Sequence, residues 1–249
     1  MGKNFLHGPI PDSIKSLKLL ENLDLHQNIL SGNIPTSIGN LTLSELYLNT
    51  NNFEGIIPSN IGYCTKLHYF NVSGNKLSGD IPNQTFGKIE GLIDLDLSKN
   101  SLIGLIPSGF GNMKHLSILY LHCNNFSGEI PKELGACTTL TMLGLANNSL
   151  QGSIPSFLTT LRSLQFLDLS NNQFSGTIPH ELENLTLLST FDLSFNHLYG
   201  EVPIGGVFSN TTTISLIGNK DLCGGIPQLK LPACPSLRPT KHKRSYESD

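Results

Sequence analysis

The sequence has little charge, no tryptophan and no long apolar segment, and these shortages exclude several classes of protein. Only 14% of the 249 residues are charged, against roughly 25% in ordinary soluble domains. The formal net charge of −3 argues against a nucleic-acid partner, because nucleic-acid binding requires concentrated Lys and Arg. No apolar run reaches the ~20 residues that cross a bilayer. We therefore expect membrane attachment only through a helix outside this chain.

Motifs that carry catalytic or metal chemistry are equally scarce. The eight histidines are scattered and lack HExxH or CxxC-type company, so we expect no metal site. The segment GFGNMK from Gly109 resembles a phosphate loop only superficially, because it lacks the third glycine. Aspartates recur at one position of the repeat described below, where we expect solvated strand residues rather than acid–base pairs: Asp24, Asp96, Asp168 and Asp192. The sequence predicts no enzyme and no cofactor.

An internal repeat of about 24 residues dominates the chain instead. It is marked by an asparagine column, namely Asn4, Asn28, Asn51, Asn75, Asn100, Asn124, Asn148, Asn172 and Asn196. Seven residues after each asparagine stands a proline, from Pro11 to Pro203, with a glycine between them each time. Three coincident columns make a chance leucine-rich helical chain an implausible interpretation.

The spacing within one unit predicts its local structure. Leucines two residues apart, such as Leu167 and Leu169, alternate with polar residues and indicate a short strand with one buried face. We expect the asparagine amides to bond backbone groups of their own and neighbouring turns, because a buried amide must be satisfied. A second apolar column should form a further buried spine: Leu6, Leu30, Phe53, Leu77, Leu102, Phe126, Leu150, Phe174 and Leu198. The glycine permits a tight bend, and Ile-Pro sets an extended path.

A unit of this length cannot bury its leucines alone, so the units must stack, with strands about 4.8 Å apart. We predict about eight full repeats after an N-terminal half repeat, with a parallel sheet on the concave side. The expected divisions are a partial repeat at 1–19, full repeats at 20–208, a capping segment at 209–235 and a basic tail at 236–249.

The unit LxxLxLxxNxLxGxIPxxLGxL, repeated over residues 4 to about 208, resembles the plant-specific leucine-rich repeat. That repeat occurs in receptor kinases, receptor-like proteins and polygalacturonase-inhibiting proteins. The resemblance implies an α/β leucine-rich-repeat solenoid, a curved right-handed coil whose concave face carries the parallel sheet.

Both ends of the chain depart from the repeat. In FSNTTTISLIGNKDLCGGIPQLKLPAC, residues 208–234, Cys223 and Cys234 are spaced for a disulfide. This segment resembles the cap of the plant immune-receptor kinases that include the receptors for elongation factor Tu and flagellin, in which a membrane helix and a kinase domain follow. Here the polar, juxtamembrane-like tail SLRPTKHKRSYESD follows, and we expect it to be disordered. Because the N-terminal cap of that family is missing, we expect a receptor fragment or a truncated gene product.

The remaining cysteines and the sequons bear on the compartment. Cys64 and Cys137 stand three repeats apart, too far to pair, and with Cys123 we expect them to be free thiols. Seven N-x-[ST] sequons favour a secreted, glycosylated surface: Asn40, Asn71, Asn83, Asn125, Asn147, Asn184 and Asn210. We expect the parent protein at the extracellular face of the plasma membrane, although the start of this chain lacks a signal-peptide pattern.

Variable outward residues of the strands are the candidate ligand-binding surface, since large exposed side chains in register are typical of interface hot spots. The candidates are Tyr47, Tyr69, Asp94, Asp96, Ile118, Tyr120, His122, Met142, Phe166 and Asp168. The alternative is ordinary packing on an exposed strand face.

The favoured function is therefore the ligand-binding extracellular region of a plant receptor-like serine/threonine kinase. It would recognise a peptide or protein in defence or development signalling, with a leucine-rich-repeat co-receptor as a second partner. The alternatives are a secreted inhibitor similar to polygalacturonase inhibitors and a truncated receptor fragment without function.

Overall fold

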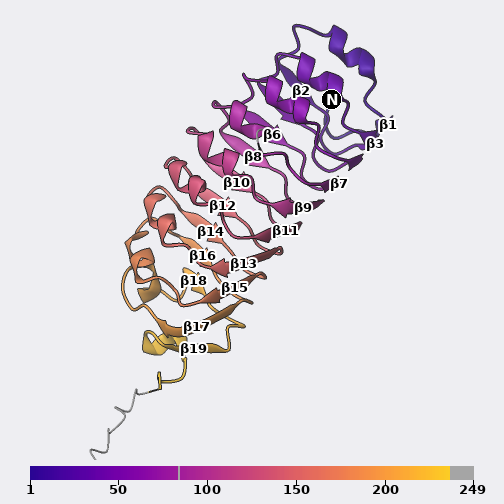
Figure 1. The fold of residues 1–249 in the computed structure, drawn as a ribbon. Helices are drawn as coiled ribbons and strands as arrows, with labels where there is room; N and C mark the ends of the chain where they lie inside the picture. Colours follow the sequence, from indigo (N-terminus) through magenta and orange to yellow (C-terminus); the bar gives the residue numbers. More distant parts are fainter. Residues whose placement is uncertain (84, 236–249) are drawn as a thin grey trace, which may run out of the picture.

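Short strands built on the Leu-x-Leu pattern stack into one continuous parallel sheet. The computed structural model describes residues 1–83 and 85–235, and the predicted basic tail lies outside the described residues. Figure 1 shows the coils following one another from the N-terminus to the C-terminal end in a curved array. This first sheet has nine strands in the described part of the chain. They are β2 (Asn22–Asp24), β4 (Glu45–Tyr47), β6 (Tyr69–Asn71), β8 (Asp94–Asp96), β10 (Ile118–Tyr120), β12 (Met142–Gly144), β14 (Phe166–Asp168), β16 (Thr190–Asp192) and β18 (Ile214–Ser215).

A second parallel sheet of ten strands follows the asparagine of each coil. The sequence predicted only a buried spine and an extended path here, so this sheet is an addition to the expected fold. Its glycines adopt left-handed backbone angles, for example φ 77° at Gly32 and 86° at Gly176, which a side chain would strain. The strands are β1 (His7–Gly8), β3 (Ile29–Asn33), β5 (Asn52–Gly55), β7 (Lys76–Gly79), β9 (Ser101–Leu105), β11 (Asn125–Gly128), β13 (Ser149–Ser153), β15 (Gln173–Gly176), β17 (His197–Val202) and β19 (Asp221–Gly224).

The backs of the coils are 3-10 turns, and residues 1–83 and 85–235 contain no α-helix. The predicted solenoid is confirmed. The expected α-helical part of each coil is instead a short 3-10 turn, because the segment after each Ile-Pro is too short for an α-helix. Glycines let these turns approach: a Cβ on Gly111 would lie 2.3 Å from the carbonyl oxygen of Glu133. The glycines of GFGNMK therefore serve coil packing. The turns are η1 (Asp12–Ser16), η2 (Thr36–Asn40), η3 (Ser59–Tyr63), η4 (Phe86–Lys88), η5 (Ser108–Asn112), η6 (Lys132–Ala136), η7 (Ser156–Thr160), η8 (His180–Asn184), η9 (Gly206–Ser209) and η10 (Pro227–Leu229).

The asparagine ladder forms as predicted, and Asn172 illustrates a rung. Its Nδ2 donates to the carbonyl oxygens of Leu145 in the preceding coil and of Leu169 and Ser170 in its own turn. Its Oδ1 accepts from the amide of Leu150 at 3.0 Å. Each amide thus joins two coils and satisfies itself. The first predicted rung, Asn4, is exposed and bonds only to the carbonyls of residues 1 and 2.

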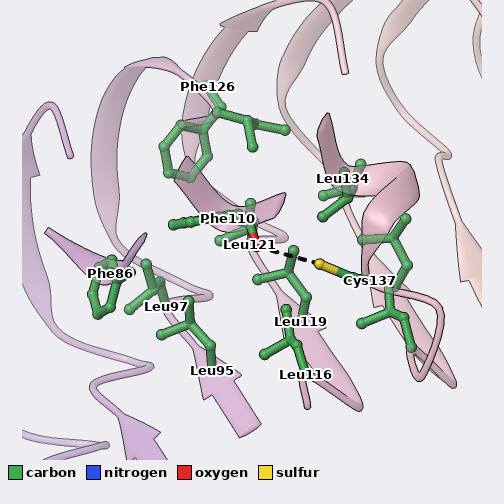
Figure 2. Packing of buried hydrophobic residues seen from close by; sticks show 14 of the residues in the cluster. Phe86, Leu95, Leu97, Phe110, Leu116, Leu119, Leu121, Phe126, Leu134 and Cys137 are labelled. Atoms are coloured by element: carbon green, nitrogen blue, oxygen red, sulfur yellow. Dashed lines mark hydrogen bonds between the residues drawn. The ribbon is translucent and has the colours of Figure 1, made fainter. Parts of the chain in front are cut away.

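The leucine, isoleucine and phenylalanine columns form one continuous core. Figure 2 shows leucines of successive concave strands packing against phenylalanines of the turns and the second sheet. Two cysteines belong to this core: the Cys137 thiol donates to the Phe110 carbonyl at 3.2 Å, and Cys64 is equally buried. Burial raises the pKa of Cys64 to about 11. Cys64, Cys123 and Cys137 are free thiols in the structure.

The expected capping segment begins with another coil. Strand β18 pairs with β16 in the concave sheet, and β19 pairs with β17 in the second sheet. Asn219 repeats the ladder bonds, with its amide donating to Leu193 and Leu216. The predicted disulfide between Cys223 and Cys234 follows, with Cα atoms 4.9 Å apart. Between the two cysteines, Leu229 and Leu231 pack against the core.

Candidate functional site

The concave sheet brings the predicted ligand-binding residues together on six adjacent strands or just beyond them. Tyr47 lies on β4, Tyr69 on β6, Asp94 and Asp96 on β8, Ile118 and Tyr120 on β10, Met142 on β12, and Phe166 and Asp168 on β14, while His122 follows β10. The parallel register places residue 118 beside residues 94 and 142, and residue 142 beside 166. All ten side chains are half-buried, because neighbours in the sheet cover part of each one.

Tyr120 occupies the centre of this surface. Its ring meets the ring of Phe166 edge to face at 6.3 Å and that of His122 at 5.5 Å. Its hydroxyl donates to the Met142 sulfur at 3.3 Å. The ring reaches across β12 because position 144 is glycine, where a Cβ would lie 2.8 Å from the tyrosine ring. Sequence reasoning missed Gly144, although its place in an otherwise polar or aromatic column was a visible signal.

Aspartates at the last position of a concave strand have a structural task. Asp168 Oδ1 accepts from the amide and the hydroxyl of Ser170, at 3.0 and 2.7 Å. Asp96 makes the same two bonds to Ser98. Asn71 replaces aspartate in its coil and accepts from Ser73 in the same way. One oxygen of each of these three side chains is therefore committed to its own turn, and the negative charge is dispensable for that bond.

Asp94, at the first position of β8, has no such task. Its Oδ1 is buried and has no hydrogen-bond partner within the described residues, whereas Oδ2 is not enclosed in this way. Burial, and then the charge of Asp96 two residues on, raise the pKa of Asp94 to about 6. An unpartnered half-buried carboxylate is costly for the fold. The repeat does not require it, because neighbouring coils place other residue types at the same position.

The concave face as a whole is acidic. Its nine strands contain six carboxylates and neither Lys nor Arg. The whole chain, by contrast, has 16 Lys and Arg against 19 Asp and Glu. Burial, with nearby carboxylates including Asp94, raises the pKa of Tyr47 and of Tyr120. Burial lowers the pKa of His122, which favours its neutral form.

The seven sequons differ in what their asparagines do. Asn40, Asn125, Asn147, Asn184 and Asn210 are exposed. Asn83 is exposed, but its Oδ1 accepts from Ser108 and Gly109 of the next coil. Asn71 lies half-buried on the concave face, and its Nδ2 also donates to Asp96. Since Asn71 and Ser73 occupy the strand-end positions that carry Asp and Ser in other coils, the fold accounts for this sequon by itself.

Other kinds of site find no support in the described part of the chain. Residues 1–83 and 85–235 bring together no group of three His, Cys, Asp or Glu side chains that could hold a metal ion. The same residues include no helix of the length and hydropathy that a bilayer crossing requires.

Stacked coils joined by an asparagine ladder, with a parallel sheet along the concave face, define this chain as a solenoid of repeated units. Models of the leucine-rich repeat match residues 19–64, 65–126 and 138–198, well over half of the chain. The chain belongs to the leucine-rich-repeat family.

Relatives and solved structures similar to this chain include plant receptors. Phytosulfokine receptor 1 of Arabidopsis thaliana is 32% identical over 111 residues, which are 34% of this chain and 11% of the receptor. The ectodomain of the Arabidopsis thaliana receptor kinase GASSHO1/SCHENGEN3, solved with CASPARIAN STRIP INTEGRITY FACTOR 2, is 37% identical with a TM-score of 0.88. That match covers 94% of this chain and 28% of the ectodomain.

Two further structures show what the same architecture accommodates. The Arabidopsis receptor kinase HAESA, solved with the peptide hormone IDA and the co-receptor SERK1, is 32% identical with a TM-score of 0.56 and is matched over 90% of this chain and 49% of its own. A plant ice-binding protein is 30% identical with a TM-score of 0.72, over 96% of this chain and 83% of that protein. The chain thus spans less than half of the length of each of these receptors.

Proposed function

We propose that this chain is ligand-binding ectodomain sequence of a plant receptor-like kinase or receptor-like protein, and that its concave face recognises a peptide. A parent serine/threonine kinase would act in defence or development signalling at the extracellular face of the plasma membrane, with a leucine-rich-repeat co-receptor as a further partner. Phosphoryl transfer belongs to a domain outside this chain.

One observation carries the proposal. Across β10, β12 and β14, side chains that the repeat does not specify form a contiguous surface, centred on Tyr120 and completed by Ile118, Met142 and Phe166. Aromatic and Met side chains that are half-buried on a rigid sheet offer large contact area at little entropic cost. Two of the receptors named above, GASSHO1/SCHENGEN3 and HAESA, were solved in complex with partners, which supports the same use here.

The proposal is tested with a random linear dodecapeptide library displayed on phage, selected against the whole chain. We expect enriched peptides whose binding is lost in Phe166→Asp, because a carboxylate there disrupts the apolar contact. Leu105→Asp is the matched control, since Leu105 is 66% exposed on the second sheet, and it should retain the peptides.

Two results would contradict the proposal. Failure to enrich any peptide on the folded chain would remove the peptide-binding function. Peptides that survive Phe166→Asp but are lost in Leu105→Asp would move the binding surface to the other sheet. Circular dichroism of both variants establishes that each remains folded.

A further inference from the structure

The acidic and the aromatic parts of the concave face are adjacent and ordered along the solenoid. Asp94 and Asp96 lie on β8, and the aromatic and apolar residues begin on the next strand, β10. Ile118 is the register partner of Asp94, and Tyr120 is the partner of Asp96. A ligand that contacts the aromatic surface therefore has the two carboxylates within reach at one end.

Asp94 lacks a hydrogen-bond partner within the described residues, unlike the repeated polar positions of the coils. Ladder asparagines and strand-end aspartates are hydrogen-bonded in their own coils, whereas Asp94 Oδ1 is buried without a bond in residues 1–83 and 85–235. No strand of the concave sheet supplies a Lys or Arg. Lys99 stands three residues beyond the end of β8 and is exposed. No cation on the strands of the concave sheet therefore pairs with Asp94, and a bound molecule could supply one.

We propose that the peptide recognised by this face carries a basic side chain, best an arginine, that binds between Asp94 and Asp96, and an apolar or aromatic side chain that packs on Tyr120, Met142 and Phe166. The inference rests on the proposed function. Arginine fits better than lysine because its planar group can bond two carboxylate oxygens and stack on neighbouring tyrosine rings. Tyr69 on β6 and Tyr120 on β10 flank the acidic pair on either side.

The sheet geometry also sets a spacing within that peptide. From β8 to β14 is three strand steps, or roughly 14 Å at about 4.8 Å for each step. An extended peptide that crosses the strands advances about 3.3 Å for each residue. The basic and apolar anchors should therefore stand about four residues apart. The raised pKa of Asp94 agrees with a carboxylate that lacks a cation in the free chain, and a bound guanidinium would lower it.

The test uses the displayed dodecapeptide library on the native chain and on the double variant D94N/D96N. Asparagine preserves the turn at position 96, as Asn71 shows at the equivalent position. The proteins are made without glycosylation, since D96N completes a sequon with Ser98. We expect native binders enriched in Arg about four residues from an apolar residue, and binders of the variant that keep the apolar residue without the Arg.

A synthetic copy of the most enriched peptide then gives the affinity. Replacing its Arg by citrulline, which keeps the shape and removes the charge, should weaken binding to the native chain about tenfold or more and leave binding to D94N/D96N nearly unchanged. Binders without basic enrichment, or the same citrulline penalty in both proteins, would overturn the inference while the proposed function stands. Absence of any binder would overturn both.

Discussion

Positions that repeat in every coil and positions that vary differ in what their polar groups do. Asn172, whose residue type recurs in every coil, uses its whole amide to join two coils. Asp168, whose residue type recurs in several coils, accepts two hydrogen bonds from the turn that follows its strand. The variable Asp94 is half-buried in the same sheet and makes no bond of this kind. Repetition thus marks residues that the fold needs, and a costly residue outside the repeat marks one that the fold does not explain.

The largest expected effect comes from removing a repeated amide. Asn172→Ala deletes three donated bonds and one accepted bond at a buried position. It leaves the Leu150 amide unsatisfied, so we expect a loss of about 2 to 4 kcal/mol in the free energy of unfolding. Urea unfolding followed by circular dichroism measures it.

The matched control is Asn125→Ala, because Asn125 is an exposed asparagine one residue after a ladder position. In non-glycosylated protein it should stay within about 0.5 kcal/mol of the native value. Equal losses in both variants would show that the ladder has no special role.

A smaller effect separates the charge of a strand-end aspartate from its hydrogen bonds. Asp168→Ala removes both bonds to Ser170 and should cost about 1.5 kcal/mol. Asp168→Asn should cost little, because Asn71 makes the same bonds in its own coil. Thermal unfolding of the two variants decides the matter, and an equally large loss in both would mean that charge, not the accepted bonds, stabilises the turn.

Replacing Asp94 should raise the free energy of unfolding, in contrast to the two losses above, and should change how that free energy depends on pH. Its pKa of about 6 in the folded chain exceeds the ordinary value of 3.8, so folding favours the protonated form. The stability associated with that proton is present below about pH 4 and is lost as the pH rises to about 6. The full shift would correspond to about 3 kcal/mol, and solvent exposure reduces it to about 1 kcal/mol.

Asp94→Asn should therefore stabilise the free chain by about 1 kcal/mol at pH 7 and flatten the slope between pH 4 and 6. The groups around it are Asp96 on its own strand, Tyr69 on β6 and Tyr120 on β10. Asp168→Asn, on β14 and three strands away from Asp94, should leave that slope in place. A slope that persists in Asp94→Asn would assign it to another carboxylate.

The same contrast explains what the sequence could predict. The strands, the ladder and the buried spine follow from columns that recur. The last rung, Asn219, was missed because one inserted residue before Leu222 interrupts the period of the repeat. The second sheet was not predicted because apolar and polar residues alternate only weakly in its strands, and because the Ile-Pro pair indicated an extended path without strand pairing. The roles of Gly144 and Asp94 could not be inferred from spacing alone. The role of Gly144 depends on the Tyr120 ring of the neighbouring strand, and that of Asp94 depends on the lack of a hydrogen-bond partner on the strands beside it.

The smallest effect concerns a backbone conformation that recurs in every coil although the residue type at that position varies. The residue before each ladder asparagine adopts a left-handed backbone, with φ 56° at Thr50 and 54° at Asn147. Asparagine tolerates this region better than a β-branched residue does. Thr50→Asn should therefore raise the free energy of unfolding by about 0.5 kcal/mol, measured by urea unfolding. Thr65→Asn, at another exposed threonine outside the left-handed positions, should change nothing. A gain of the same size at both sites would show that side-chain solvation, and not backbone strain, distinguishes the repeated positions from the rest.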